Sequence, residues 1–380
     1  MIERIKILHC VPDDKFIDGA ISLFEQDDRV INTWCHFVQD PKEELQFIKN
    51  VQVMVPAFAE LDKYAHQCDA IILHSFEALP IEQMEKLPDR QKIIWFGWGH
   101  DMYEGRTPII PIKLYLPKTQ KIYEELYGPK TVIKHIKHWI RVNVMRKPYS
   151  RIISRIDYFS GVFPYEYDLL AQKQPKFKGR KLDFYYASTS FFIKDECPCA
   201  ITNDRKNVII GNSAHITNNH MDAIDWVAEH VHMVDDCRVI LPLSYGSEEN
   251  YTNRVKEYAK SRLGNNIYIL DSYLPIDEYW ELVSNCKIAI FPHIRQQASD
   301  NIFYELMTGA KVYMTKQSLA YSYLKQLGLV VFSLEDDIAT IDNTLSHADV
   351  MKNREILTEL YSVSTQIERV HNIIATLITE

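Results

Sequence analysis

Short apolar runs alternate with amphipathic stretches along most of this chain, and this alternation limits the folds that it can adopt. The pattern predicts a buried strand over residues 5–10 and a helix over residues 16–25. Further strands at 69–74 and 93–96, with a helix at 81–87, continue the series. Strands that alternate with helices in this way indicate a parallel sheet covered by helices.

A second alternating set begins after an irregular stretch. Prolines and charges interrupt the pattern between residues 175 and 205. Beyond this stretch the pattern predicts four more strands, at 207–210, 238–243, 266–270 and 287–291. The predicted helices lie at 219–231, 248–262, 276–284 and 301–307, and helical character returns from residue 347.

We therefore expect an α/β protein with two doubly wound, Rossmann-like domains in series, because 380 residues are enough for two separate cores. The expected divisions are 1–185 for an N-terminal domain and 186–355 for a C-terminal domain. Residues 356–380 would form a C-terminal helix that can pack back on the first domain.

Charge and composition narrow the functional classes. The net charge of -8 argues against a general nucleic-acid binder, which would need a dominant basic face. The N-terminal segment lacks the apolar core of a signal peptide, and no stretch approaches the roughly 20 apolar residues that cross a bilayer. Seven scattered cysteines suit reduced thiols. We expect a cytoplasmic protein whose membrane contact is at most peripheral.

A metal site is not predicted. Cys197 and Cys199, followed by His215 and His220, have ligand types that suit zinc. Their Cys-x-Cys spacing is tighter than the usual gap of about two to four residues in zinc sites.

The loops after the strands of the second half are the best candidates for a ligand site. In open parallel sheets, ligands bind beyond the carboxyl ends of the strands. Small residues there let a phosphate approach the backbone, and hydroxyl groups add donors. The residues of this kind are Gly211, Asn212, Ser213, Ser244, Tyr245 and Tyr273. Each of these loops can also be explained as an ordinary turn or helix cap.

The loop after the predicted strand 287–291 is the richest in polar residues. Arg295 can pair with a diphosphate. The start of the next helix, at Ser299, Asp300 and Asn301, would add its dipole. Glu305, in the first or second turn, can accept a hydrogen bond from a sugar or deoxyribose hydroxyl. A capped helix with a surface glutamate is the alternative.

Five segments, spanning about residues 4–335, resemble one known family: KILHCVPDDKF, WFGWGHDMY, VIIGNSAHITNNH, LPLSYG and IRQQASDNIFYELMTGAKVYM. They are similar to glycosyltransferase family 56, the bacterial 4-acetamido-4,6-dideoxy-galactose transferases of enterobacterial common antigen assembly. The resemblance implies a GT-B fold with two lobes facing across a cleft, a dTDP-sugar donor, a polyprenyl-diphosphate-linked acceptor, an inverting displacement and no required metal. It implies donor contacts at Gly211, Asn212, Ser213, Ser244, Tyr245, Arg295 and Glu305.

An inverting transfer needs a base that takes the proton of the acceptor hydroxyl. We expect this base in the first domain, and we favour Asp14, then Asp13, then Asp101. Asp13 or Asp14 can instead cap the helix that follows. Trp95, Trp98 and Tyr103 can stack on a sugar or a lipid, or they can belong to the core.

Residues 126–156 contain eight basic residues and no acidic one. Isoleucines recur there at helical spacing, so one helix face would be apolar and the other cationic. Such a helix can lie on an anionic membrane surface beside a lipid-linked acceptor. The segment is marked by Lys134, Lys137, Trp139 and Arg141. An internal helix with solvated lysines is the alternative.

Two other functions remain open at the level of sequence. A non-hydrolysing nucleotide-sugar epimerase shares the two-lobed architecture, and a catalytically silent sugar-nucleotide- or lipid-binding partner would use the same loops. A dinucleotide dehydrogenase is disfavoured because no strand is followed by Gly-x-Gly-x-x-Gly. A serine or cysteine hydrolase is disfavoured because its nucleophile-elbow pattern is missing.

Overall fold

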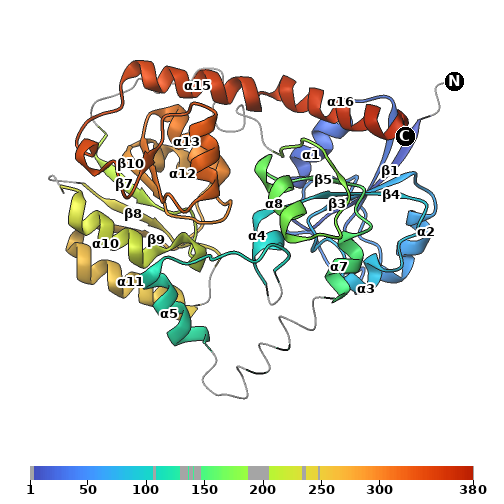
Figure 1. Ribbon diagram of the computed structural model, residues 1–380, viewed down its shortest axis with the longest axis horizontal. Coiled ribbons are helices and arrows are strands. Elements are labelled where there is room, and N and C mark those ends of the chain that lie inside the picture. The colour runs from blue at the N-terminus through green and yellow to red at the C-terminus, as the bar shows by residue number, and fades with distance from the viewer. Residues whose placement is uncertain are drawn as a thin grey trace. The chain divides into compact units, whose positions relative to one another are not determined.

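The computed structural model describes residues 4–105, 108–128, 147–186, 205–232, 237–246 and 249–379, together with Ile136 and Ile140. The chain divides into two compact units, each built on one six-stranded sheet (Figure 1). Unit 1 comprises Met1–Pro111, Ile133–Ser188 and Tyr361–Glu380. Unit 2 comprises Ile112–Val132 and Thr189–Leu360.

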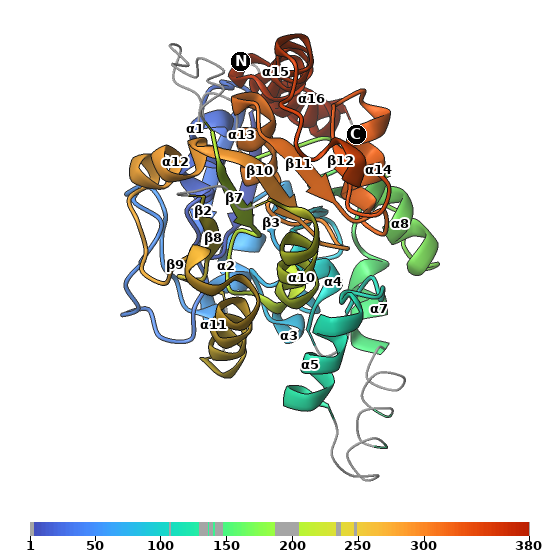
Figure 2. The ribbon, with the colours of Figure 1, turned by 90° about the vertical axis from the view of Figure 1, so that its left-hand side faces the viewer.

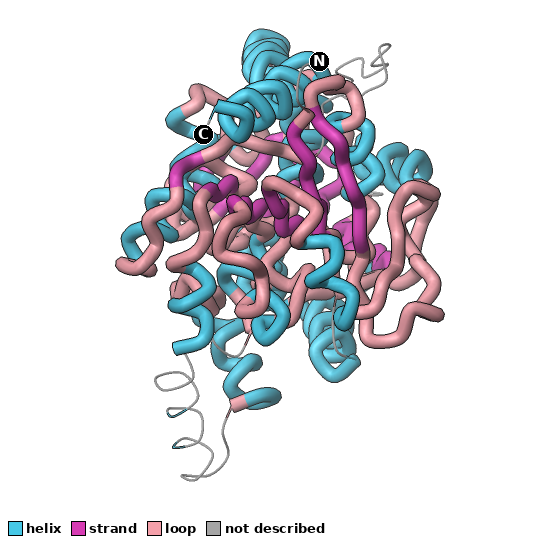
Figure 3. The backbone as a smooth tube through the Cα atoms, turned by 90° about the vertical axis from the view of Figure 1, so that its right-hand side faces the viewer, coloured by secondary structure: helices cyan, strands magenta, loops and turns pink. Residues whose placement is uncertain are grey.

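The sheet of unit 1 is parallel throughout and has the order β2-β1-β3-β4-β5-β6. Its strands are β1 (Ile5–Cys10), β2 (Val30–Cys35), β3 (Ala70–His74), β4 (Lys92–Phe96), β5 (Tyr158–Ser160) and β6 (Arg180–Lys181). Helices flank these strands (Figure 3): α1 (Ile17–Phe24), α2 (Leu61–Ala65), α3 (Ile81–Met84), α4 (Gly99–Tyr103), α7 (Lys147–Ile153), α8 (Tyr165–Lys173) and α16 (Val363–Thr379). The strand order reverses between β1 and β3, so this pair forms the switch point of the sheet.

The sheet of unit 2 is also parallel and has the order β12-β11-β10-β7-β8-β9 (Figure 2). Its strands are β7 (Asn207–Ile210), β8 (Val239–Pro242), β9 (Ile267–Leu270), β10 (Cys286–Phe291), β11 (Lys311–Met314) and β12 (Phe332–Ser333). Its helices are α5 (Pro117–Tyr127), α10 (His220–His230), α11 (Glu249–Leu263), α12 (Ile276–Ser284), α13 (Ser299–Thr308), α14 (Leu319–Gln326) and α15 (His347–Tyr361). Here the switch point lies between β7 and β10.

Each unit has its own apolar core, formed by its strands and the inner faces of its helices. In unit 1, Ile7 and Ile72 of the sheet pack with Ile21 of α1. In unit 2, Ile210 and Ile290 of the sheet pack with Ile224 of α10. The prediction of an α/β chain with two doubly wound domains is therefore confirmed.

The segment that contains α5 belongs to unit 2, whereas the expected domain ranges placed it in the first domain. The Asp222 carboxylate on α10 accepts the backbone N–H groups of Lys118 and Thr119 at 3.0 and 2.9 Å. The Lys118 ammonium also pairs with Asp225. These contacts cap the first turn of α5 and attach it to α10, which a sequence pattern does not reveal because the partners lie about 100 residues apart.

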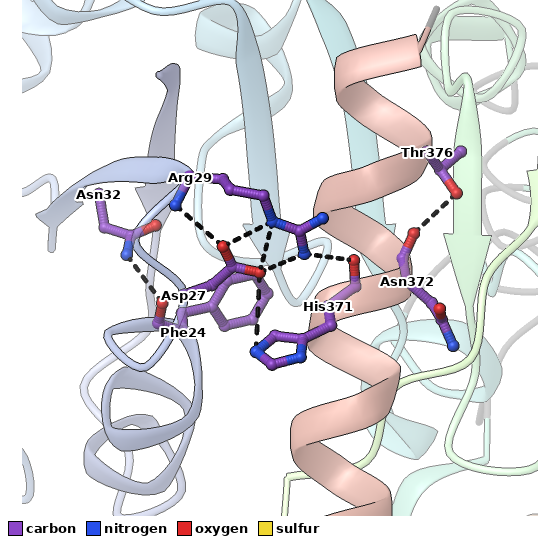
Figure 4. Close-up of polar contacts among 7 residues, drawn as sticks. All are labelled: Phe24, Asp27, Arg29, Asn32, His371, Asn372 and Thr376. Carbon is purple, nitrogen blue, oxygen red and sulfur yellow. Dashed lines mark hydrogen bonds and ion pairs between the residues drawn. The ribbon is translucent and has the colours of Figure 1, made fainter. Parts of the chain in front are cut away.

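The last helix, α16, packs on α1 and β1 of unit 1. Its buried residues Val370, Ile373, Ile374 and Leu377 join the core of this unit. A polar cluster borders the contact (Figure 4). The Arg29 Nη2 donates to Asp27 Oδ2 at 2.5 Å and to the His371 carbonyl at 3.1 Å, so Arg29 links α16 to the segment between α1 and β2.

The Asp27→Asn change is expected to destabilise unit 1 by about 1–2 kcal/mol at about pH 7. The Asp27 side chain is only 3% exposed, and its hydrogen bond from Arg29 lowers the pKa of this carboxyl. A depressed pKa gives a contribution that is present above the unfolded value and is lost as pH falls through the folded value. Urea unfolding of both proteins should therefore show a stability gap that narrows as the pH falls below the usual pKa of an aspartate.

The neighbouring Asp28→Asn change is the matched control, because Asp28 is exposed. It removes the same charge outside the cluster and should leave the free energy of unfolding nearly unchanged. A gap of equal size for both variants, or one that persists at acid pH, would show that the Asp27 pair does not hold α16 in place.

Candidate functional site

The carboxyl ends of β7 and β10 lie side by side at the switch point of unit 2. Gly211 follows β7 with φ +67, a left-handed conformation that favours glycine. A Cβ on this residue would lie 2.4 Å from Asn218 Oδ1, which is closer than non-bonded atoms can approach. Only glycine therefore lets the backbone of this loop pass against the Asn218 amide.

The Asn218 side chain joins the two loops through four hydrogen bonds. Its Oδ1 accepts the Asn212 N–H at 3.1 Å and the His293 Nε2–H at 2.7 Å. Its Nδ2 donates to Ser213 Oγ at 3.1 Å and to the His215 carbonyl at 3.0 Å. Burial, followed by the Arg295 charge, lowers the pKa of His293 well below its usual value, so this ring is neutral. Asn218 is fully buried, and its four bonds fix the loop after β7 against the loop after β10.

Asn219 makes a second set of loop contacts from a left-handed backbone with φ 49. Its Nδ2 donates to the carbonyls of Thr217 and Pro292 at 3.1 and 2.9 Å. Its Oδ1 accepts the Leu116 N–H at 2.8 Å. This buried side chain connects the start of α10, the loop after β10 and the segment that precedes α5.

The outer part of this site is a polar cluster of Asn212, Thr217, Tyr245, Arg295 and Gln297. Asn212 Nδ2 donates to the Tyr245 hydroxyl at 3.2 Å, and Gln297 Nε2 donates to Asn212 Oδ1 at 3.2 Å. The Thr217 hydroxyl donates to Gln297 Oε1 at 2.5 Å. Arg295 Nη2 lies 3.5 Å from Thr217 Oγ1. The structure thus brings together loops that follow three strands, β7, β8 and β10, and adds one buried guanidinium.

The first turn of α13 follows shortly after Gln297, the last residue of this cluster along the chain. Ala298 precedes the helix with φ 57, an uncommon conformation for a residue with a side chain. Ser299, Asp300 and Asn301 lie in the first turn, which begins two residues earlier than predicted. The Tyr279 hydroxyl of α12 donates to Asn301 Oδ1 at 2.6 Å and fixes this turn. The amide groups and dipole of a helix start favour an anion at this point.

Three other residues predicted for this site lie apart from the hydrogen bonds of the cluster. Within the described ranges, neither Ser244 nor Tyr273 shares a hydrogen bond with it, and the side chain of Tyr273 is 69% exposed. Glu305 is 1% exposed, so the alternative of a surface glutamate is wrong. Its two carboxyl oxygens have no hydrogen-bond partner among the described residues. Burial raises the pKa of Glu305 well above its usual range, against the opposing charge of Arg205.

The three predicted aspartates of unit 1 have different surroundings. Asp13 accepts the backbone N–H groups of Gln46, Phe47 and Ile48 at 2.6 to 3.0 Å, and so holds the loop after β2. Burial alone would raise its pKa, but these amide groups lower it. The capping alternative is therefore wrong for Asp13, whose partners lie outside the following helix.

Asp101 is also held by N–H donors. Its carboxylate accepts the backbone N–H groups of Phe76 and Trp98 at 2.6 and 2.8 Å and the Trp95 indole N–H at 3.1 Å. Burial raises the pKa of Asp101 to about 6. Because three N–H groups donate to this buried carboxylate, Asp101 stabilises the turn at the start of α4.

Asp14 is half-buried and makes one hydrogen bond, from the Phe16 N–H to its Oδ1 at 3.0 Å. Within the described residues its Oδ2 accepts no hydrogen bond. Burial raises the pKa of Asp14, while the Phe16 amide and Lys15 act in the opposite direction. Of the three aspartates, Asp14 is the one with a carboxylate oxygen left to accept a proton.

The aromatic residues near α4 differ in exposure. Trp95 and Tyr103 are buried in the core, whereas Trp98 is half-buried. The predicted membrane residues Lys134, Lys137, Trp139 and Arg141 lie outside the described residues, as do Cys197 and Cys199. Within that basic segment, Ile136 and Ile140 are helical and are 54% and 44% exposed. In the described ranges no helix is long and apolar enough to span a bilayer, and no three His, Cys, Asp or Glu side chains are grouped for a metal.

Sequence reasoning did not identify Thr217, Asn218, Asn219, His293 and Gln297 as site residues. One local signal was present, since two asparagines in succession directly before a helix are residue types that accept left-handed backbone. The partners of these side chains depend on the pairing of β7 with β10, which the local sequence does not show.

Comparison with solved structures identifies the fold. Anabaena HepE in complex with UDP and glucose superimposes with a TM-score of 0.60 at 12% identity, covering 98% of this chain and 100% of that chain. The N-terminal domain of Candida albicans trehalose-6-phosphate phosphatase gives 0.63 at 9%, covering 100% and 97%. The α,α-trehalose 6-phosphate synthase of Burkholderia multivorans gives 0.58 at 10%, covering 100% and 98%. The fold shared with these proteins is GT-B.

The chain matches the model of the family described as 4-alpha-L-fucosyltransferase glycosyl transferase group 56. The match covers residues 153–357, which is more than half of the chain. The matched range contains β7 to β12 and therefore both loops of the switch point of unit 2.

Proposed function

Because this chain belongs to glycosyltransferase family 56, we propose that it transfers a deoxy or amino-deoxy hexose from a dTDP-sugar to a polyprenyl-diphosphate-linked glycan, with inversion at the anomeric carbon and without a metal. The reaction would serve bacterial surface polysaccharide assembly. The observation that carries the donor half of this proposal is the polar cluster at the switch point of unit 2, where Arg295 and three loops converge.

The leaving group of this reaction is a nucleoside diphosphate, and its negative charge grows as the anomeric bond breaks. Arg295 supplies a positive charge, and the first turn of α13 supplies amide N–H groups and the positive end of a dipole. The Gly211–Ser213 backbone allows a phosphate to approach closely, because Gly211 has no side chain. The complex of Anabaena HepE with UDP and glucose supports a nucleotide ligand on this fold.

Other contacts of the donor are assigned by position. Ser244, Tyr245 and Tyr273 follow β8 and β9 at the same carboxyl edge of the sheet, where a base or sugar would lie. Glu305 is a buried carboxyl whose pKa is raised by burial, and in its protonated form it can both donate to and accept from a hydroxyl group.

The acceptor half of the reaction is assigned to unit 1, with Asp14 as the base. Lys134, Lys137, Trp139 and Arg141 would hold the protein on the inner face of the cytoplasmic membrane, next to a lipid-linked acceptor. The exposed isoleucines Ile136 and Ile140, spaced by one helical turn, support an apolar face in this segment.

Calorimetric titration with dTDP, UDP and GDP, with and without Mg²⁺, tests the donor site. We expect dTDP to bind most tightly, with no effect of Mg²⁺. The Arg295→Ala change should weaken dTDP binding about 10- to 100-fold, because it removes a charged hydrogen-bond donor. Arg254→Ala is the matched control, since Arg254 is a half-exposed arginine on α11 that pairs with Glu125.

The alternatives give different results in the same titration. Preference for UDP together with sugar interconversion in the absence of an acceptor would favour a nucleotide-sugar epimerase. Absence of nucleotide binding in a folded protein would contradict the transferase assignment of this site and would favour a lipid-binding partner.

A further inference from the structure

A chain of four polar side chains lies at the switch point of unit 1. His9 is in β1, His74 ends β3, Asn32 is in β2 and Tyr186 follows β6. His9 Nε2 lies 3.0 Å from Asn32 Oδ1, and His9 Nδ1 lies 2.9 Å from His74 Nε2. His74 Nδ1 lies 2.8 Å from the Tyr186 hydroxyl. Both histidines are fully buried, and neither takes part in the donor site.

The hydrogen positions in this series of four hydrogen-bonded side chains follow from the residues at its two ends, Asn32 and Tyr186. Asn32 Nδ2 donates to the Phe24 carbonyl at 3.3 Å, so Asn32 Oδ1 faces His9 and His9 Nε2 carries the hydrogen. Burial lowers the pKa of His9 to about 3 and the pKa of His74 well below its usual value, so both rings are neutral. His74 Nε2–H therefore donates to His9 Nδ1, and the Tyr186 hydroxyl donates to His74 Nδ1. This pattern fixes the Tyr186 side chain in one position.

The Tyr186 ring belongs to a group of three half-buried aromatic rings. Its centroid lies 5.3 Å from that of Trp98 and 6.4 Å from that of Phe16, and Phe16 lies 6.0 Å from Trp98. Phe16 and Trp98 meet edge to face at 86°, and Trp98 and Tyr186 do so at 85°. The Phe16 amide binds Asp14, so the proposed base lies beside these rings.

The turn that carries His74 is strained. Ser75 has φ 108, although it is not glycine, and it is fully buried. Its N–H donates to the Phe96 carbonyl at 3.1 Å, and its hydroxyl accepts the Glu77 N–H at 3.1 Å. Such conformations are unfavourable and persist where the surroundings enforce them, often at functional sites. The strain is therefore located one residue from the imidazole that holds Tyr186.

We propose that Phe16, Trp98 and Tyr186 form the surface on which the pyranose ring of the acceptor packs, next to Asp14, and that His74 is the positioning residue for Tyr186. This inference rests on the proposed function. A pyranose presents apolar C–H groups on one face and hydroxyl groups at its edge. Aromatic rings suit the first and a carboxylate suits the second. A prenyl chain would not need the carboxylate, so the combination favours the sugar part of the acceptor.

Saturation-transfer NMR with irradiation of aromatic protons tests this surface. The probes are methyl glucoside, methyl mannoside, methyl galactoside and methyl N-acetylglucosaminide, with octyl glucoside for the lipid alternative and dTDP as the reporter of the donor site. We expect transfer to the ring C–H protons of at least one pyranoside. Tyr186→Ala and Trp98→Ala should each weaken its binding about 3- to 10-fold, with dTDP affinity unchanged.

The positioning role has its own variants. His74→Ala should weaken pyranoside binding as Tyr186→Ala does. His74→Gln should restore most of it, because a glutamine amide can accept from the Tyr186 hydroxyl and donate to His9. If Tyr186→Ala unfolds the protein, Phe16→Ala tests the same surface, because Phe16 is another half-buried ring of this group.

The outcomes separate this inference from the proposed function. The inference about the aromatic surface would be overturned if the ring variants bind the pyranosides as tightly as the wild type does. It would also be overturned if saturation transfer reaches only the octyl chain of octyl glucoside. A wild-type protein that binds dTDP but none of the pyranosides would also overturn it and leave the donor assignment intact. If the wild type fails to bind dTDP but still binds a pyranoside that the ring variants no longer bind, that result would support the aromatic surface and contradict the proposed donor.

Discussion

Replacing Asp14 with asparagine is expected to lower the turnover number for sugar transfer by about 100- to 10,000-fold, the usual contribution of a general base. The Phe16 amide holds Asp14 Oδ1, and among the described residues nothing donates to Oδ2. An asparagine keeps the size of the side chain and a carbonyl oxygen for the Phe16 amide, but it cannot take a proton from the acceptor hydroxyl. Transfer is measured with dTDP-sugar and a lipid-linked acceptor, and dTDP binding should be unchanged.

The pH dependence of the wild type gives a second measure of the same group. Burial raises the pKa of Asp14 above the usual value for an aspartate, and a base acts only in its deprotonated form. The rate should therefore fall as the pH is lowered, with a midpoint above the usual pKa of an aspartate. In Asp14→Asn this acid limb should disappear from the residual activity.

Asp13→Asn and Asp101→Asn are the controls, since each removes a carboxylate whose oxygens bind backbone N–H groups. Their main effect should be on the free energy of unfolding, with the acid limb retained. An Asp14→Asn enzyme of wild-type activity, or loss of the acid limb in Asp101→Asn alone, would contradict the assignment of the base.

The fold could be predicted because buried parallel strands are continuous apolar runs bounded by turns. The limits of β1, β7 and α12 agree with the sequence prediction residue for residue. Each of these elements is a compact apolar or amphipathic stretch with a clear turn or cap at its ends, so that local sequence determines it.

Three of the strands that were not predicted, β2, β6 and β12, lack this local signal. β6 and β12 have two residues each, and both residues of β6 are exposed. β2 contains Asn32 and Thr33 among its apolar residues, and Asn32 is used there to orient His9. Such strands form because a neighbouring strand offers its free edge, and this is a property of the sheet rather than of the segment.

The site could be predicted only in part for the same reason. Position after a strand was enough to select Gly211, Asn212 and Arg295, because the carboxyl edge of a parallel sheet collects such loops. The hydrogen bonds of Asn218 to His293 and of His9 to His74 join residues 75 and 65 positions apart. Their partners become evident only when the strand order is known.

Replacing Gly211 with alanine should remove most of the affinity for dTDP, by about 10-fold or more, because the added Cβ displaces the Asn218 amide. The Cβ of an alanine would lie 2.4 Å from Asn218 Oδ1, so either the loop after β7 or the Asn218 side chain has to move. Such a shift breaks the bonds of Asn218 to Asn212 and His293, which hold the phosphate-facing backbone. Calorimetric titration with dTDP measures the effect.

Gly264→Ala separates the steric effect from backbone strain. Gly264 has φ +61, close to the +67 of Gly211, but a Cβ there would meet nothing within 4 Å. Both changes should destabilise the protein by about 1–2 kcal/mol through left-handed strain, and only Gly211→Ala should weaken dTDP binding. Equal dTDP affinity in the two variants would mean that the contact of Gly211 with Asn218 does not shape the donor site. Because strain is matched in the pair, any difference in affinity is due to the contact between the loop and Asn218.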